Sequence, residues 1–160
     1  MEREWGPVFV HESGHALMAV LCEIECHGIY FERDAEKPRF CALTTPTAPA
    51  NRTNKDYLVS AAGVAAEKLI YHNESEGADA DRLDFAQASA PSFDATVDEA
   101  YEILSANKRK LKRLVSMLKS KAREVDLDLG RLPELGMDGT QKRYLVLLGK
   151  EELESAVRRP

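Results

Sequence analysis

Two histidines and a glutamate near the start of the chain are the residues whose types and spacing predict chemistry. They lie in the segment His11-Glu12-Ser13-Gly14-His15. Residues four apart on a helix share one face, so both imidazoles can bind the same metal ion. The H-E-x-x-H arrangement is typical of zinc sites. The spacing therefore predicts Zn²⁺ bound by His11 and His15, provided that this segment is helical.

Glu12, beside the first of these histidines, is predicted to act on a water molecule bound to the metal. Zinc lowers the pKa of such a water from about 15.7 to about 7, and a carboxylate can accept its proton as the water attacks a carbonyl. We therefore expect Glu12 to be the general base, and then the proton donor, of a hydrolytic reaction. Gly14, between the ligands, would let another segment approach this helix closely.

The third metal ligand is not decided by the residues alone. A catalytic zinc ion usually has three protein ligands and a water molecule. The sequence has no H-x-x-G-x-x-H extension after His15, and His27 and His72 stand alone. An acidic segment, Gly77-Ala-Asp-Ala-Asp81-Arg-Leu-Asp84, offers carboxylates. Its aspartates could equally cap a helix or interact favourably with its dipole.

Three short motifs resemble the peptidase domain of the FtsH-type ATP-dependent zinc proteases. That family has H-E-A-G-H followed by A-L, then G-G-x-x-A-E-E, then G-A-x-x-D, and the order and approximate separations agree here. The resemblance covers roughly residues 8–157, is specific at the three motifs and is loose in the closing helices. The matching segments are Val10-His-Glu-Ser-Gly-His-Ala-Leu17, Ala61-Ala-Gly-Val-Ala-Ala-Glu-Lys-Leu-Ile70 and Gly77-Ala-Asp-Ala-Asp81.

The resemblance implies roles for further residues. The aspartate of the family's G-A-x-x-D motif is the third zinc ligand and matches Asp81; Asp84, one turn later, is the alternative. Glu67 matches the glutamate of the second motif, and we expect it to orient a ligand, since ligating groups usually need such a partner. Ser13 replaces the family's common alanine, and Ala62 replaces its first glycine.

The family's ATPase module and membrane anchors are not expected within these 160 residues. No G-x-x-x-x-G-K-[ST] segment is present, and no glycine-rich loop opens a helix with a lysine placed to meet phosphates. We therefore expect a stand-alone peptidase domain that does not itself consume ATP.

These residues together predict a zinc-dependent metalloendopeptidase that acts on peptides or unfolded proteins. Two alternatives stay open: a non-catalytic metal-binding interaction module with the same fold, and a zinc hydrolase of non-peptide amides. A homo-oligomer or a separate partner protein is compatible with the sequence. The substrate is expected to dock as an added strand along residues 39–45, because an exposed strand edge pairs readily with an extended peptide.

The elements expected around the site make a mainly α domain with one small β-hairpin. A helix is predicted from Pro7 to about 22–25, since proline suits the first helical turn and apolar residues follow at helical spacing. Residues 27–33 and 39–45 are predicted to form the two strands of the hairpin. The whole chain, 1–160, is expected to be a single domain. Further helices are predicted at 55–72, from about 79 to before 91, from 92 or 94 to about 125, and, after a turn, within 144–157, with loops at 46–54 and 126–140.

Composition and charge argue against several other classes of protein. The hydrophobic share of 44% and the charged share of 31% are typical of a globular chain, and the net charge of −5 predicts no general attraction to nucleic acid or anionic lipid. The basic run Lys108–Arg113 lacks interleaved aromatics and is expected on a solvated helix face. Without a signal peptide or an apolar run of about 18–20 residues, we expect a soluble cytoplasmic protein with no membrane segment.

The three cysteines, Cys22, Cys26 and Cys41, predict no disulfide framework, because their number is odd and no export signal precedes them. The spacing Cys22-x-x-x-Cys26-His27 could indicate a second metal site, but no matching pair completes it. Free cysteines often pack as small apolar residues, and we expect that role here.

Overall fold

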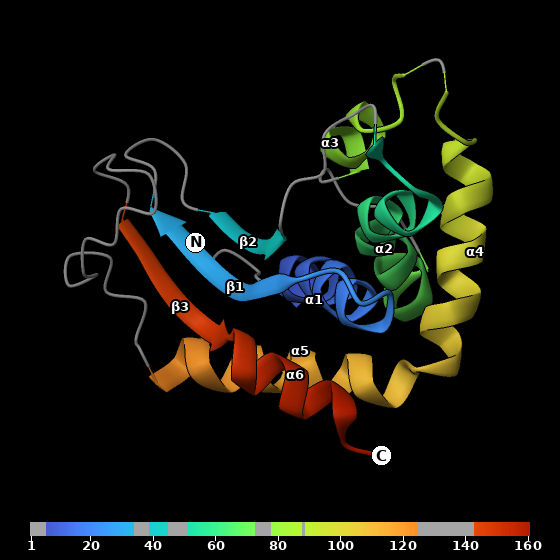
Figure 1. Cartoon of the computed structure of the whole chain (residues 1–160). Coiled ribbons are helices and arrows are strands. Elements are labelled where there is room, and N and C mark those ends of the chain that lie inside the picture. Colours follow the sequence, from blue (N-terminus) through green and yellow to red (C-terminus); the bar gives the residue numbers. More distant parts are fainter. Residues whose placement is uncertain (1–5, 34–38, 45–50, 73–77, 88, 125–142) are drawn as a thin grey trace.

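The computed structural model describes residues 6–33, 39–44, 51–72, 78–87, 89–124 and 143–160, and it is mainly helical with a small sheet (Figure 1). The mainly α class predicted from the sequence is confirmed. In chain order the elements are α1 (Gly6–Leu21), β1 (Cys26–Arg33), β2 (Arg39–Thr44), α2 (Asn54–Tyr71), α3 (Ala78–Leu83), α4 (Phe93–Ala106), α5 (Lys108–Glu124), β3 (Arg143–Gly149) and α6 (Lys150–Arg158).

Helices α1 and α2 pack closely against each other, because small residues meet at their contact. A Cβ atom at Gly14 of α1 would lie 2.4 Å from the carbonyl oxygen of Ala62 and 2.6 Å from the Cβ of Ala66, so only glycine fits this position without movement. Small side chains on α2 bring the two backbones together. The H-E-x-x-H segment of α1 therefore lies directly against α2.

Local signals fix the ends of these two helices. Glu23 follows α1 in the left-handed region (φ 58°), and the Ile24 N–H donates to the Ala19 carbonyl at 2.9 Å, as in a Schellman motif. At the start of α2, the Thr53 N–H donates to the carboxylate of Asp56 at 2.7 Å, which is half of a capping box. Both helices are confirmed close to their predicted bounds.

The sheet has three antiparallel strands in the order β2-β1-β3. The predicted hairpin of β1 and β2 is confirmed, but the prediction of a hairpin alone is wrong because β3 pairs along the other side of β1. The segment that became β3 is a short apolar run, which periodicity cannot assign to strand or helix. Gly28 (φ 124°) permits this pairing, since a Cβ there would lie 2.2 Å from the Leu148 carbonyl oxygen.

The predicted single helix from 92 or 94 to about 125 is wrong, because the chain forms two helices, α4 and α5, that meet at Asn107. The Asn107 side chain donates to the Ile103 carbonyl at 2.9 Å, and the backbone carbonyl of Asn107 accepts from the N–H groups of Lys110 and Leu111. A polar side chain that bonds nearby backbone groups competes with helix continuation in this way. Asn107 therefore ends one helix and starts the next.

One cluster of buried hydrophobic residues connects the elements, from Phe9 in α1 to Val157 in α6. The short helix predicted near Asp79 is present as α3, and a helix, α6, closes the chain as predicted. The predicted loop at 126–140 and most of that at 46–54 lie outside the described residues. None of the helices in the described part of the chain is long and apolar enough to cross a bilayer. The stripe predicted for the long helix is buried: Leu104, Leu111, Leu114, Val115 and Leu118.

Candidate metal centre

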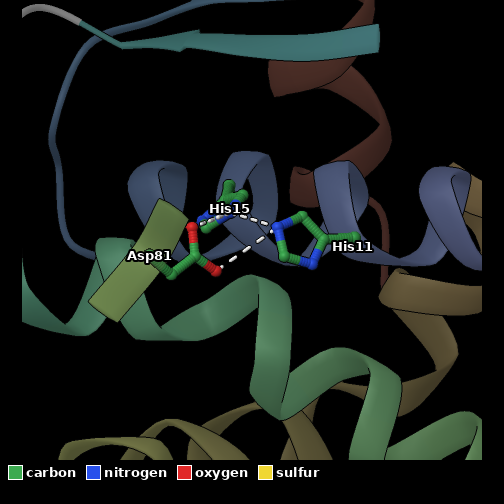
Figure 2. Close-up of side chains that lie close together, drawn as sticks. All are labelled: His11, His15 and Asp81. Carbon is green, nitrogen blue, oxygen red and sulfur yellow. Dashed lines mark hydrogen bonds and ion pairs between the residues drawn. The ribbon is translucent and has the colours of Figure 1, made fainter. Parts of the chain in front are cut away.

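His11, His15 and Asp81 lie together between α1, α2 and α3 (Figure 2). The Nε2 atoms of the two histidines are 3.0 Å apart. Asp81 approaches both rings, with Oδ2 3.3 Å from His11 Nε2 and Oδ1 3.3 Å from His15 Nε2. The structure thus brings together the two histidines of the H-E-x-x-H motif and the aspartate that the resemblance implies as the third ligand.

The spacing of the four atoms in these contacts is close to that of ligand atoms around a small tetrahedral cation. Two ligand atoms bound about 2.1 Å from a tetrahedral zinc ion lie about 3.4 Å from each other. Each oxygen of Asp81 lies at about this separation from one histidine, Oδ2 from His11 and Oδ1 from His15, and the separation between the histidines is shorter by a few tenths of an ångström. One ligand atom from each residue can be chosen so that all three lie within 4.8 Å of one another.

The outer nitrogens of both histidines are occupied by acceptors. His15 Nδ1 lies 2.6 Å from the backbone oxygen of Val59, and His11 Nδ1 lies 2.5 Å from Glu67 Oε1. A carbonyl oxygen can only accept, so His15 Nδ1 carries the hydrogen and its Nε2 presents a lone pair when the ring is neutral. The buried carboxylate of Glu67 does the same for His11 and fulfils the orienting role expected of it.

With both rings neutral, three acceptors would therefore converge on one point without a donor among them. When both rings are neutral, two imidazole lone pairs and a carboxylate face each other, and like groups of this kind repel unless a cation lies between them. Asp81 Oδ2 is buried, and with both rings neutral it has no hydrogen-bond donor among the described residues. An orphaned buried oxygen of this kind needs a partner, and a divalent metal ion bound by two nitrogens and an oxygen would supply it.

The electrostatics of the group favour positive charge at its centre. Burial alone would lower the pKa of His11, but contacts with Asp81 and Glu67 outweigh burial and raise it to about 10. Burial also acts to lower the pKa of His15, and Asp81 again outweighs it, so that this pKa is raised. Burial would raise the pKa of Asp81, but its hydrogen bonds with the two histidines lower it to about 2. A proton or a metal cation can satisfy this arrangement.

Gly63 of α2 is a site residue that the sequence analysis missed. A Cβ atom there would lie 2.5 Å from His15 Nε2 and 2.6 Å from His11 Nε2, so only a glycine leaves room for the ligand atoms. The available signal was a glycine retained inside a helix, where it costs stability relative to alanine.

Glu12 points from α1 toward the sheet rather than joining the ligands. Its Oε2 accepts a hydrogen bond from the backbone N–H of Ala42 in β2 at 2.7 Å. Strand β2 is visible beyond the histidines at the top of Figure 2. Burial raises the pKa of Glu12, against the lowering effects of the two histidines and the Ala42 N–H. The chain thus holds a carboxylate of increased basicity beside the group that could hold a metal ion.

The other candidate ligands lie elsewhere. Asp84 accepts a hydrogen bond from Ser60, and its carboxylate lies outside the group of three possible ligands found in the described residues. Asp79 is exposed at the start of α3. His27 faces Glu25, with 3.7 Å between Nδ1 and Oε1, and His72 follows α2 in the left-handed conformation. Cys22 and Cys26 form no second metal-binding group within the described ranges.

Comparison with known proteins adds no assignment, since neither the protein-family models nor the curated proteins gave a match for this chain.

Proposed function

We propose that this protein is a zinc-dependent metallopeptidase, in which His11, His15 and Asp81 bind the metal and Glu12 is the general base. The observation that carries the proposal is the convergence of two oriented imidazoles and a buried carboxylate on one point. Two nitrogens and one oxygen are a donor set used by catalytic zinc sites, which keep a position for water or substrate. Bound zinc would supply a Lewis acid that polarises a carbonyl and lowers the pKa of a water molecule.

Glu12 performs the proton transfers in this proposal. The Ala42 N–H fixes one oxygen of its carboxylate at 2.7 Å, so the side chain does not rotate freely. The raised pKa of Glu12 makes the carboxylate a better proton acceptor near neutral pH. Glu12 takes the proton of the attacking water and then gives it to the leaving amine.

Strand β2 is the proposed docking site for the peptide. In the described sheet it lies at an edge, with β1 on its inner side. Its Ala42 N–H already reaches the general base. A peptide that pairs with this edge as an added strand would pass close to Glu12 and to the metal ligands. Main-chain pairing of this kind favours extended peptides or unfolded chains as substrates.

The test is zinc content and peptide hydrolysis in the protein and in a Glu12→Gln variant. Glutamine keeps the shape of the side chain but cannot accept the proton, so hydrolysis should fall by roughly 10²- to 10⁴-fold while about one zinc per chain stays bound. Glu99→Gln, an exposed change on α4, is the matched control and should leave both unchanged. His11→Ala or His15→Ala should abolish zinc binding, because each removes a ligand.

Two results would replace the proposal by an alternative. Stoichiometric zinc without hydrolysis of any peptide in a broad library would indicate a metal-binding interaction module. Cleavage of small amides but of no peptide would indicate a zinc hydrolase of another substrate class. Hydrolysis that is equal in the protein and in Glu12→Gln would show that Glu12 is not the base.

A further inference from the structure

Asp84, one turn beyond the proposed ligand Asp81, is held by two residues near the start of α2. The Ser60 hydroxyl donates to Asp84 Oδ2 at 2.8 Å. Arg52 Nη2 donates to the same hydroxyl oxygen at 2.6 Å, and Arg52 Nη1 lies 3.6 Å from Asp84 Oδ1. The three side chains form a closed polar network, which we call the Arg52–Ser60–Asp84 clamp.

The guanidinium of Arg52, which is the cation of this clamp, is itself held in place. The Arg52 side chain is 15% exposed, and its guanidinium carbon lies 4.7 Å above the centre of the buried Tyr57 ring. A cation placed over an aromatic face is attracted by the ring, and the planar guanidinium has few alternative orientations. Arg52 can therefore hold Ser60 and Asp84 in a constant position relative to α2.

The clamp acts on the segment that carries Asp81. Helix α3 is only six residues long, and Ala78 is the one fully buried residue within it. The backbone N–H of Asp84 donates to the Asp81 carbonyl at 3.2 Å, so the two residues share one turn. A short helix with little buried surface needs other contacts to keep a side chain in place. Fixing Asp84 against α2 restricts where Asp81 can lie.

Helix α2 then supports all three ligands. Val59, next to Ser60, accepts the hydrogen bond of His15, and Glu67 accepts that of His11. The contact of Phe85 with the Tyr57 ring, 5.1 Å between centroids, also keeps the α3 segment near α2. Hydrogen bonds restrict direction more strictly than apolar contact does. The clamp therefore adds directional contacts with α2 to the turn that carries the carboxylate of Asp81, beside the contacts of Arg82 with Asp94 and with the Phe93 ring of α4.

We propose that the Arg52–Ser60–Asp84 clamp is a positioning device that holds Asp81 at the metal centre, an inference that rests on the proposed metal site. Asp84 acts through the backbone it shares with Asp81 and does not itself contact the metal. Its loss should weaken metal binding without removing a ligand. Outer contacts of metal ligands typically change affinity by about 10- to 100-fold, and we expect the lower end of this range because the clamp acts through the backbone.

The experiment measures zinc affinity by competition with a coloured chelator, in the full chain and in five variants, of which Asp81→Ala removes the proposed ligand itself. Asp84→Asn and Ser60→Ala break the clamp and should each weaken zinc binding about 10-fold. Ser60→Thr retains the hydroxyl and should restore the affinity of the unchanged protein. Asp79→Asn removes the same charge from an exposed position on α3 and should leave the affinity unchanged, which controls for a general loss of attraction to cations.

Two further readouts separate positioning from loss of structure. Thermal unfolding of the chelator-treated variants should stay close to that of the unchanged protein, while the visible absorption of bound Co²⁺ should shift because the ligand geometry is altered. Unchanged zinc affinity in both Asp84→Asn and Ser60→Ala would overturn the positioning role of the clamp and leave the proposed metal site standing. Complete loss of zinc in Asp84→Asn with retention in Asp81→Ala would make Asp84 a ligand and overturn it as well. An unchanged protein that binds no metal would overturn the proposed function together with the clamp.

Discussion

The hydrogen bonds on the outer side of each imidazole determine what the inner side can bind. The Val59 carbonyl and the Glu67 carboxylate hold the rings of His15 and His11 by their Nδ1 atoms. Both Nε2 lone pairs are thereby directed at the carboxylate of Asp81 when the rings are neutral. The ligand atoms are oriented by the fold itself, so a metal ion does not have to order them on binding.

At the scale of single residues, we predict that zinc binding displaces a proton from His11. Its pKa of about 10 means that the ring is protonated at pH 7 in protein stripped of metal, whereas a ligating nitrogen must have a free lone pair. Calorimetry at pH 7 in buffers of different ionisation enthalpy should therefore show release of at least about one proton per zinc. The apparent affinity should weaken about tenfold for each pH unit below 10, per proton displaced.

The same pKa gives a stability prediction of defined sign. The folded pKa of His11 lies above its unfolded value of about 6.5. Protonated His11 thus stabilises the stripped protein fully below about pH 6.5, and this contribution is lost as pH rises through about 10. The melting temperature of the stripped protein should fall between pH 7 and pH 10. Zinc binding without proton release, or a flat melting temperature over this range, would contradict the raised pKa.

At the scale of elements, helix α2 presents one face to the centre. Val59, Gly63 and Glu67 are each four residues apart and so lie on a single face of the helix. The two outer members hold the histidine rings, and Gly63 leaves the space between them. The close packing of α1 on α2 is therefore part of the site as well as of the core.

We predict that Gly63→Ala abolishes zinc binding. An alanine inside a helix is normally stabilising by roughly 0.5–1 kcal/mol relative to glycine, but here the new Cβ would lie within 2.6 Å of both Nε2 atoms. In a His11→Ala/His15→Ala background these contacts are gone, so the alanine should recover that stabilisation. Urea unfolding of the four proteins, together with zinc titration, measures both effects.

Gly14→Ala is the contrasting variant for this prediction. Its Cβ would meet the Ala62 carbonyl at 2.4 Å, which is backbone and cannot move aside easily. It should destabilise the fold whether or not the histidines are present. Zinc binding by Gly63→Ala at normal affinity would show that the rings move apart at little cost.

The sequence predicts side chains at the centre better than it predicts their supports. The H-E-x-x-H spacing and the resemblance indicate His11, His15 and Asp81, because the chemical groups of side chains follow directly from the residue types. The Val59 carbonyl has no such signal, since every residue carries one and only the packing of α1 on α2 selects it. Strand β3 was missed for a related reason: its apolar run suits a strand only because β1 offers an unpaired side.

At the scale of the whole molecule, the centre lies between three helices, and Glu12 beside it contacts the edge strand β2. The side chains of His11, His15 and Asp81 are 9%, 15% and 12% exposed. If the chain is the proposed peptidase, a scissile bond has to leave its own surroundings to reach these partly buried side chains. An extended or unfolded segment can do this directly, whereas a stable folded protein must first open locally, at a cost that can approach its global stability.

We therefore predict that this chain, purified as it stands, cleaves unfolded proteins, spares stable folded ones and is indifferent to ATP. Its sequence has no phosphate-binding G-x-x-x-x-G-K-[ST] loop, so nucleotide should not supply the work of unfolding. The measurement is digestion of one stable protein, native and chemically unfolded, with and without ATP and with a zinc chelator as the blank. ATP-stimulated digestion of the native form by this chain alone would contradict the prediction, because local opening of the substrate would then not limit its access to the metal centre.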